Sequence, residues 1–122
     1  MGKGAKRFQD LVCWQLGREL RVLIAQLVVK PPLSRDAALC DQFRRAARSV
    51  TGNIAEGFPC PSNAEFARFL DIARRSLNEI EDRLTETLDS GLLPQESVEK
   101  AFNLTKRTNV AVSRLINYLR RT

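Results

Sequence analysis

Histidine is absent from this sequence of 122 residues, and cysteine occurs only three times. The absence of histidine removes the side chain most often used in acid–base catalysis and a common zinc ligand. Cys13, Cys40 and Cys60 are odd in number and show no paired spacing, which argues against a disulfide framework and against a zinc site. The sequence therefore predicts no metal site, and its cysteine usage favours a reducing cytoplasm.

The sequence also lacks the motifs of common enzyme classes. It contains no glycine-rich phosphate loop, and no candidate nucleophile has a base at a helical spacing. Glu56 and Glu65 flank one loop and could meet there, but helix capping already explains Glu65. We therefore expect a protein that is not an enzyme and needs no cofactor.

Long apolar runs are missing as well. The longest run extends from Val22 to Val29 and includes Gln26, so it is far shorter than the roughly 20 residues needed to cross a bilayer. The sequence predicts a soluble protein without a membrane partner.

The clearest pattern that is present is an apolar stripe in the second half of the chain, with steps of three and four residues that place its members on one helical face. The stripe consists of Phe66, Leu70, Ala73, Leu77, Ile80, Leu84 and Leu88. Ser62 and Glu65 form a capping-box pattern at its start. A helix over about 62–90 follows.

Three further helices are expected, over about 8–30, 36–56 and 94–121. Pro31-Pro32 would end the first, Ser34 could cap the second, Gly57 offers a left-handed end to the second, and Pro94 would start the fourth. Their core stripes are Val12, Leu16, Leu20, Leu23 and Leu27; Leu39, Phe43, Ala47, Val50 and Ile54; and Ala101, Thr105, Thr108, Val112, Leu115, Ile116 and Leu119. Small residues in the second helix, including Gly52, would allow close helix approach. The predicted fold is all-α, a single domain over 1–122 forming an antiparallel up-down-up-down four-helix bundle.

Several short motifs carry a resemblance to a known family. They are Asn53-Ile54-Ala55-Glu56-Gly57, the preceding Arg44-Arg45-Ala46-Ala47, the later pairs Glu65-Phe66, Phe69-Leu70, Ile72-Ala73 and Ser76-Leu77, and the opening Phe8-Gln9-Asp10-Leu11 and Trp14-Gln15. Together they resemble the bacterial four-helix-bundle proteins encoded in intervening sequences of 23S rRNA genes.

That family includes the accessory variability protein of diversity-generating retroelements, a homopentameric bundle that binds nucleic acid and a reverse transcriptase. The resemblance therefore implies a homopentamer with a role of this type, either as a partner of a reverse transcriptase or as a protein encoded in an rRNA intervening sequence.

Charge is distributed unevenly along the chain, whose net charge is +6. Residues 1–32 and residues 92–122 each hold six basic and two acidic residues, whereas residues 62–91 hold four basic and seven acidic ones. Because the first and fourth helices are neighbours in such a bundle, their two net charges of +4 would share one side of the molecule.

Within the fourth helix, Lys100, Arg107, Arg114 and Arg121 recur every seven residues and form one stripe, here called the basic ladder. A phosphate backbone or an acidic protein could bind it, or its members could pair with carboxylates of the third helix.

Trp14 is expected on the outer side of the first helix beside Arg18 and Arg21. A subunit interface and base stacking both explain such a tryptophan. Asn53 could hydrogen-bond across helices or subunits, or only to its own helix.

We assign Trp14, Asn53 and Glu56 to an oligomer interface. We assign nucleic-acid contacts to Arg18, Arg21, Arg44, Arg48, Lys100, Arg107, Arg114 and Arg121. The predicted function is a non-enzymatic adaptor for RNA or DNA, and the alternative is an oligomeric interaction scaffold with no nucleic-acid role.

Overall fold

Four α-helices dominate residues 4–122, the part of the chain that the computed structural model describes. They are α1 (Val12–Leu27), α2 (Ala37–Gly57), α3 (Asn63–Asp89) and α4 (Gln95–Arg121), with short 3-10 helices η2 (Phe8–Asp10) and η3 (Leu33–Arg35). No strand occurs within these residues. The expectation of an all-α chain with four helices is confirmed.

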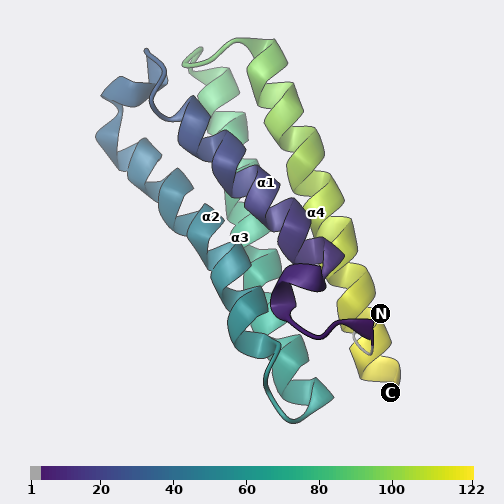
Figure 1. The fold of residues 1–122 in the computed structure, drawn as a ribbon. Helices are drawn as coiled ribbons and strands as arrows, with labels where there is room; N and C mark the ends of the chain where they lie inside the picture. The colour runs from purple at the N-terminus through teal and green to yellow at the C-terminus, as the bar shows by residue number, and fades with distance from the viewer. Residues whose placement is uncertain (1–3) are drawn as a thin grey trace.

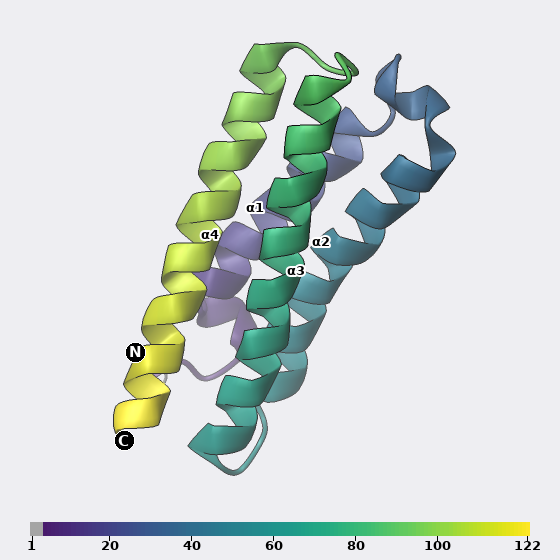
Figure 2. The same cartoon turned by 180° about the vertical axis from the view of Figure 1, so that it is seen from behind.

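The four helices lie side by side in a ring. α1 packs against α2 and α4, and α3 packs against the same two helices from the other side. The loops that join consecutive helices lie at alternating ends of the molecule (Figure 1), and the view from behind shows α3 between α2 and α4 (Figure 2). The α1/α2 and α3/α4 seams are therefore on opposite faces. None of the helices in the described range has the length and apolar character required to span a membrane.

One hydrophobic core lies between the helices and takes side chains from all four. The stripes predicted for α2 and α4 are buried throughout, and so is the α3 stripe up to Leu84. Leu88 departs from the prediction, since it is 38% exposed in the last turn of α3. The α3 stripe thus leaves the core before the helix ends.

The first helix differs most from its predicted form. It spans Val12–Leu27 instead of 8–30, because Leu11 has an extended backbone (φ −72°, ψ 131°) that separates it from η2. Its core face is also rotated from the predicted stripe: Val12 is 63% exposed, and the buried side consists of Cys13, Gly17, Leu20, Ile24 and Leu27. Gly17 explains the rotation, since a Cβ there would lie 3.2 Å from the Val50 and Thr51 side chains of α2.

The helix ends show which capping signals were correct. Ser62 caps α3 as predicted, with its Oγ accepting from the Glu65 backbone N–H at 3.1 Å. The cap of α2 is Asp36, whose carboxylate accepts from the Leu39 N–H at 3.0 Å, whereas Ser34 lies within η3. Gly91 closes α3 with a positive φ of 64°, and the next N–H bonds back to the Thr87 carbonyl at 3.0 Å.

Gly57 has a different role from the one its position suggested. It is the last residue of α2 and does not adopt the left-handed conformation; among the described glycines only Gly91 has positive φ. A Cβ at Gly57 would lie 2.7 Å from Phe66 Cδ1 and 2.8 Å from Phe69 Cβ, so a side chain there would collide with α3. Gly52, expected to allow close approach, is instead exposed with open space beside it.

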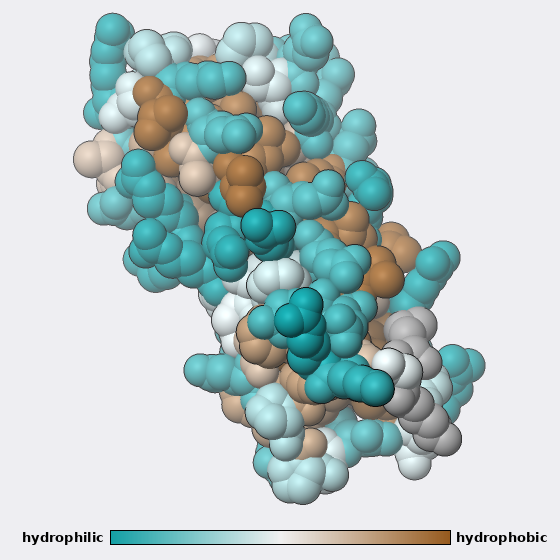
Figure 3. Space-filling view, viewed as in Figure 1, coloured by the Kyte–Doolittle hydropathy of each residue, from teal (hydrophilic) through white to brown (hydrophobic). Residues whose placement is uncertain are grey.

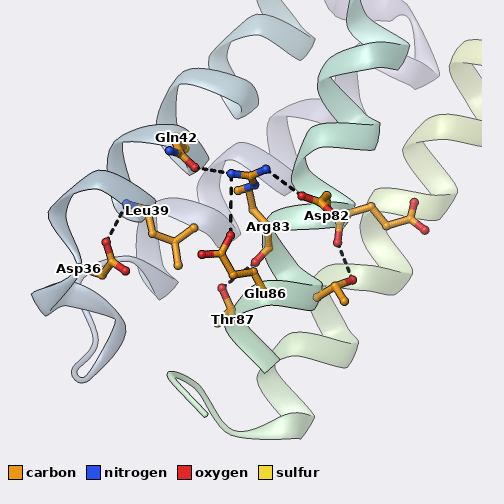
Figure 4. A network of polar contacts seen from close by, with 9 residues as sticks. Asp36, Leu39, Gln42, Asp82, Arg83, Glu86 and Thr87 are labelled. Atoms are coloured by element: carbon orange, nitrogen blue, oxygen red, sulfur yellow. Dashed lines mark hydrogen bonds and ion pairs between the residues drawn. The ribbon is translucent and has the colours of Figure 1, made fainter. Parts of the chain in front are cut away.

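Polar side chains also tie α2 to α3. Arg83 of α3 donates to Gln42 Oε1 of α2 at 2.7 Å and pairs with Asp82 at 2.8 Å, and Glu86 lies 3.8 Å away (Figure 4). About two turns away along α3, the hydroxyls of Ser49 and Ser76 are 2.7 Å apart. These contacts add directional links to the apolar packing of this pair.

Candidate nucleic-acid interface

The basic ladder of α4 is open to solvent along its length. Lys100, Arg107, Arg114 and Arg121 are all exposed, and none takes part in an ion pair or side-chain hydrogen bond between residues 4 and 122. Arg114 lines a cavity with Leu11 and Val12, at the start of α1. The repeat of seven residues places the four side chains on the outer side of α4, away from the buried face of the helix.

The carboxylates of the acidic helix α3 that form ion pairs bind cations outside the ladder. Asp71 of α3 accepts from Arg120, which is not part of the ladder, and pairs with Arg74 of its own helix at 3.1 Å. No ion pair between the ladder and α3 occurs among residues 4–122, so the alternative in which the ladder pairs with α3 is not supported. The four ladder charges remain available to a partner.

Three of the predicted arginines come together at the α1/α2 seam. Arg21, Arg44 and Arg48 line a groove of about 260 Å³ whose floor is formed by Ile24, Ala25 and Ala47. Arg21 is half-buried and held by a 2.8 Å hydrogen bond to Thr51 Oγ1, and Arg44 lies 3.5 Å from Asp41. We call this set the arginine groove. Arg18 is exposed on α1 but does not line it.

The residues assigned to an oligomer interface lie in different surroundings. Trp14 is half-buried and packs edge-on against Phe8, with ring centroids 5.4 Å apart, so it is less exposed than expected. The Asn53 amide donates to the Ser49 carbonyl at 2.8 Å, which is the local bond that had been left open as an alternative. Glu56 is exposed. Their role between subunits stays a prediction.

The α3/α4 seam holds a second basic groove that was not predicted from the sequence. Its volume is about 490 Å³, and its lining residues are Arg74, Asn78, Lys106, Asn109, Val110, Ser113, Arg114 and Asn117. No carboxylate is among them. Polar residues recur at intervals of three and four along α4, and this spacing predicts a polar flank of the helix. It does not predict that Asn78 of α3 faces that flank.

The surface that carries α1 is mixed in character. Hydrophobic side chains form separate patches between hydrophilic ones on this face (Figure 3). Val12, Val22 and Val29, which belong to α1 and the turn after it, are among the large apolar residues that remain exposed.

The cysteines are free thiols, and no group of metal-binding side chains occurs in the described part of the chain. Burial raises the pKa of the Cys13 thiol to about 12, and burial also raises the pKa of Cys40. Cys40 donates to the carbonyl groups of Val28 and Leu33. Neither buried thiol has the depressed pKa of a reactive cysteine.

Residues 4–122 thus form an all-α protein with exposed cations in the basic ladder and further cations that line two grooves. Comparison with family models gives a match to the 23S rRNA-intervening sequence protein over residues 9–114, which is most of the chain. The chain belongs to this family. A comparison with curated proteins finds no match.

Proposed function

We propose that this chain is a non-enzymatic nucleic-acid-binding accessory protein that holds phosphate backbones on its basic surfaces. The single observation that supports it best is the basic ladder, whose four cations are exposed and have no carboxylate partner within residues 4–122. Unpaired cations in a row bind phosphates with release of condensed counterions, and such contacts position a protein without reading sequence.

The proposal includes a particular assembly. We infer an antiparallel up-down-up-down bundle that forms a homo-oligomer in the cytoplasm, a pentamer if it follows the resemblance. Symmetry would repeat the ladder and the arginine groove in each subunit, so several weak contacts would act on one nucleic acid. In this proposal the protein acts as an adaptor, with a reverse transcriptase as a candidate protein partner.

A binding experiment tests the role of the ladder. Lys100→Gln with Arg107→Gln removes two ladder charges without touching either groove, and Arg68→Gln with Arg75→Gln removes two exposed charges of α3 as a matched control. The first variant should bind RNA and duplex DNA more weakly than the wild-type protein in a filter assay, and the control should bind nearly as well.

The competing function is an oligomeric scaffold without a nucleic-acid role. It is supported if the wild-type protein retains neither RNA nor DNA at low salt. Equal losses in the two variants would instead mean that net charge, and not the ladder, governs binding.

A further inference from the structure

The groove between α3 and α4 differs in chemistry from the other basic surfaces of the molecule. Three cations, Arg74, Lys106 and Arg114, line it together with three asparagines and one serine. It is an open groove of about 490 Å³ and not an enclosed cavity. The arginine groove offers guanidinium groups over an apolar floor and no amide.

The hydrogen-bonding capacity of these amides is largely unused. Asn78 Oδ1 and Asn109 Nδ2 are 3.5 Å apart, and Ser113 Oγ lies 3.4 Å from Asn109 Oδ1, so both contacts are at the long limit of a hydrogen bond. Asn117 makes no side-chain hydrogen bond within residues 4–122 and is exposed. Each amide could donate and accept at the same time.

Two of the three cations of the groove are also free to act. Lys106 and Arg114 have no carboxylate partner among the described residues, and Arg74 shares Asp71 with Arg120. A ligand that satisfies this groove would carry negative charge beside planar donor and acceptor groups. A nucleotide in a single strand has both, whereas in a duplex the Watson–Crick edges of the bases are already paired and only their groove edges remain free.

We propose that the α3/α4 groove binds a segment of single-stranded nucleic acid through its bases as well as its phosphates. Lys106, Arg114 and Arg74 hold the phosphates, and the amides of Asn78, Asn109 and Asn117 bond to the exposed base edges. Arg114 also belongs to the basic ladder, so a strand lying along α4 could enter the groove from it. This inference rests on the proposed nucleic-acid function and adds a preference for unpaired bases.

Removing the amides without changing charge tests the inference. Asn78→Ala with Asn109→Ala leaves all cations in place, and the substitutions favour helix formation, so the fold should survive. Asn103→Ala is the matched control, because Asn103 is exposed on α4 and does not line the groove. Circular dichroism melts of the three proteins verify that each is folded.

The probes are short single-stranded RNA and DNA oligomers and an abasic oligomer with the same number of phosphates. In a fluorescence-anisotropy titration the double variant should bind both base-containing oligomers about five- to a hundredfold more weakly, the range that one or two well-made base contacts provide. Its affinity for the abasic oligomer should match that of the wild-type protein. The Asn103→Ala control should match the wild-type protein on every probe.

Two results overturn the inference and are distinguishable. If the wild-type protein binds all probes and the double variant binds them equally well, the groove does not contact bases, although the ladder still binds phosphate. If the wild-type protein binds none of the probes, the proposed function fails together with the groove. A larger loss for RNA than for DNA in the double variant would support the inference and identify RNA as the preferred strand.

Discussion

Gly57 lies so close to Phe66 that a Cβ on the glycine would be 2.7 Å from Cδ1 of the ring. The contact joins the last turn of α2 to the first turn of α3, where the chain reverses through Phe58 and Pro59. A side chain at this position would force the two helices apart beside the loop that connects them.

Gly57→Ala should therefore destabilise the fold by about 1–3 kcal/mol, since overpacking displaces neighbouring groups. Gly52→Ala is the matched control: the same helix has open space there, so the substitution should stabilise by about 0.5–1 kcal/mol through helix propensity. Urea unfolding of both variants measures the difference. A stabilising effect at both positions would contradict the close contact.

Leu77 and Leu88 belong to one predicted stripe but differ in burial. Leu77 is fully buried in the core, and Leu88 is partly exposed near the end of α3. Leu77→Ala should reduce the free energy of unfolding by about 2–5 kcal/mol through lost burial and a cavity, whereas Leu88→Ala should stay within about 1 kcal/mol. Equal shifts in the urea midpoint would show that the core boundary on α3 is misplaced.

The three cysteines should differ in reactivity. Cys13 and Cys40 are buried and their pKa values are raised, so few thiolates form at mildly alkaline pH, while Cys60 is only half-buried in the α2–α3 loop. Ellman's reagent should react rapidly with one thiol per native chain and with all three in urea. If the native Cys60→Ser variant still reacted rapidly with Ellman's reagent, a second thiol would be accessible in the native protein.

Trp14 should contribute to the contact between subunits. If it does, Trp14→Ala should lower the mass of the assembly in light scattering while helical circular dichroism is largely kept. Ile72→Ala, which removes a partly exposed apolar side chain from α3, serves as the control. If the mass of the assembly is unchanged in the Trp14→Ala variant, Trp14 packs within its own subunit against Phe8 and does not hold subunits together.

Much of the fold follows from helical periodicity, because the buried faces of α2, α3 and α4 repeat at helical spacing and each carries several large apolar side chains. The buried face of α1 could not be predicted from periodicity, for a physical reason. Its sequence supports two stripes that share Leu20 and Leu27, and the real one is completed by Cys13 and Gly17, whose small size allows α1 to approach Val50 and Thr51. Periodicity counts large residues and overlooks such contacts.

The candidate site was predictable where one helix carries it and not where two helices meet. The ladder lies on α4 alone, so its spacing was sufficient to predict that its members share one face. The α3/α4 groove joins Asn78 to Asn109 and Ser113 across a seam whose facing flanks depend on the rotation of both helices. The arginine groove could not be predicted either, because it depends on the hydrogen bond between Arg21 of α1 and Thr51 of α2.

The salt dependence of binding tests the central claim most directly. Titration of duplex DNA at several salt concentrations gives a line of log K against log salt whose slope counts neutralised phosphates, at about 0.9 per contact. Lys100→Gln with Arg107→Gln should flatten this slope by about 1.8 for each subunit in contact with the DNA, and Arg68→Gln with Arg75→Gln should leave it unchanged. An identical slope for the wild-type protein and the ladder variant would contradict the account, since the ladder would then touch no phosphate.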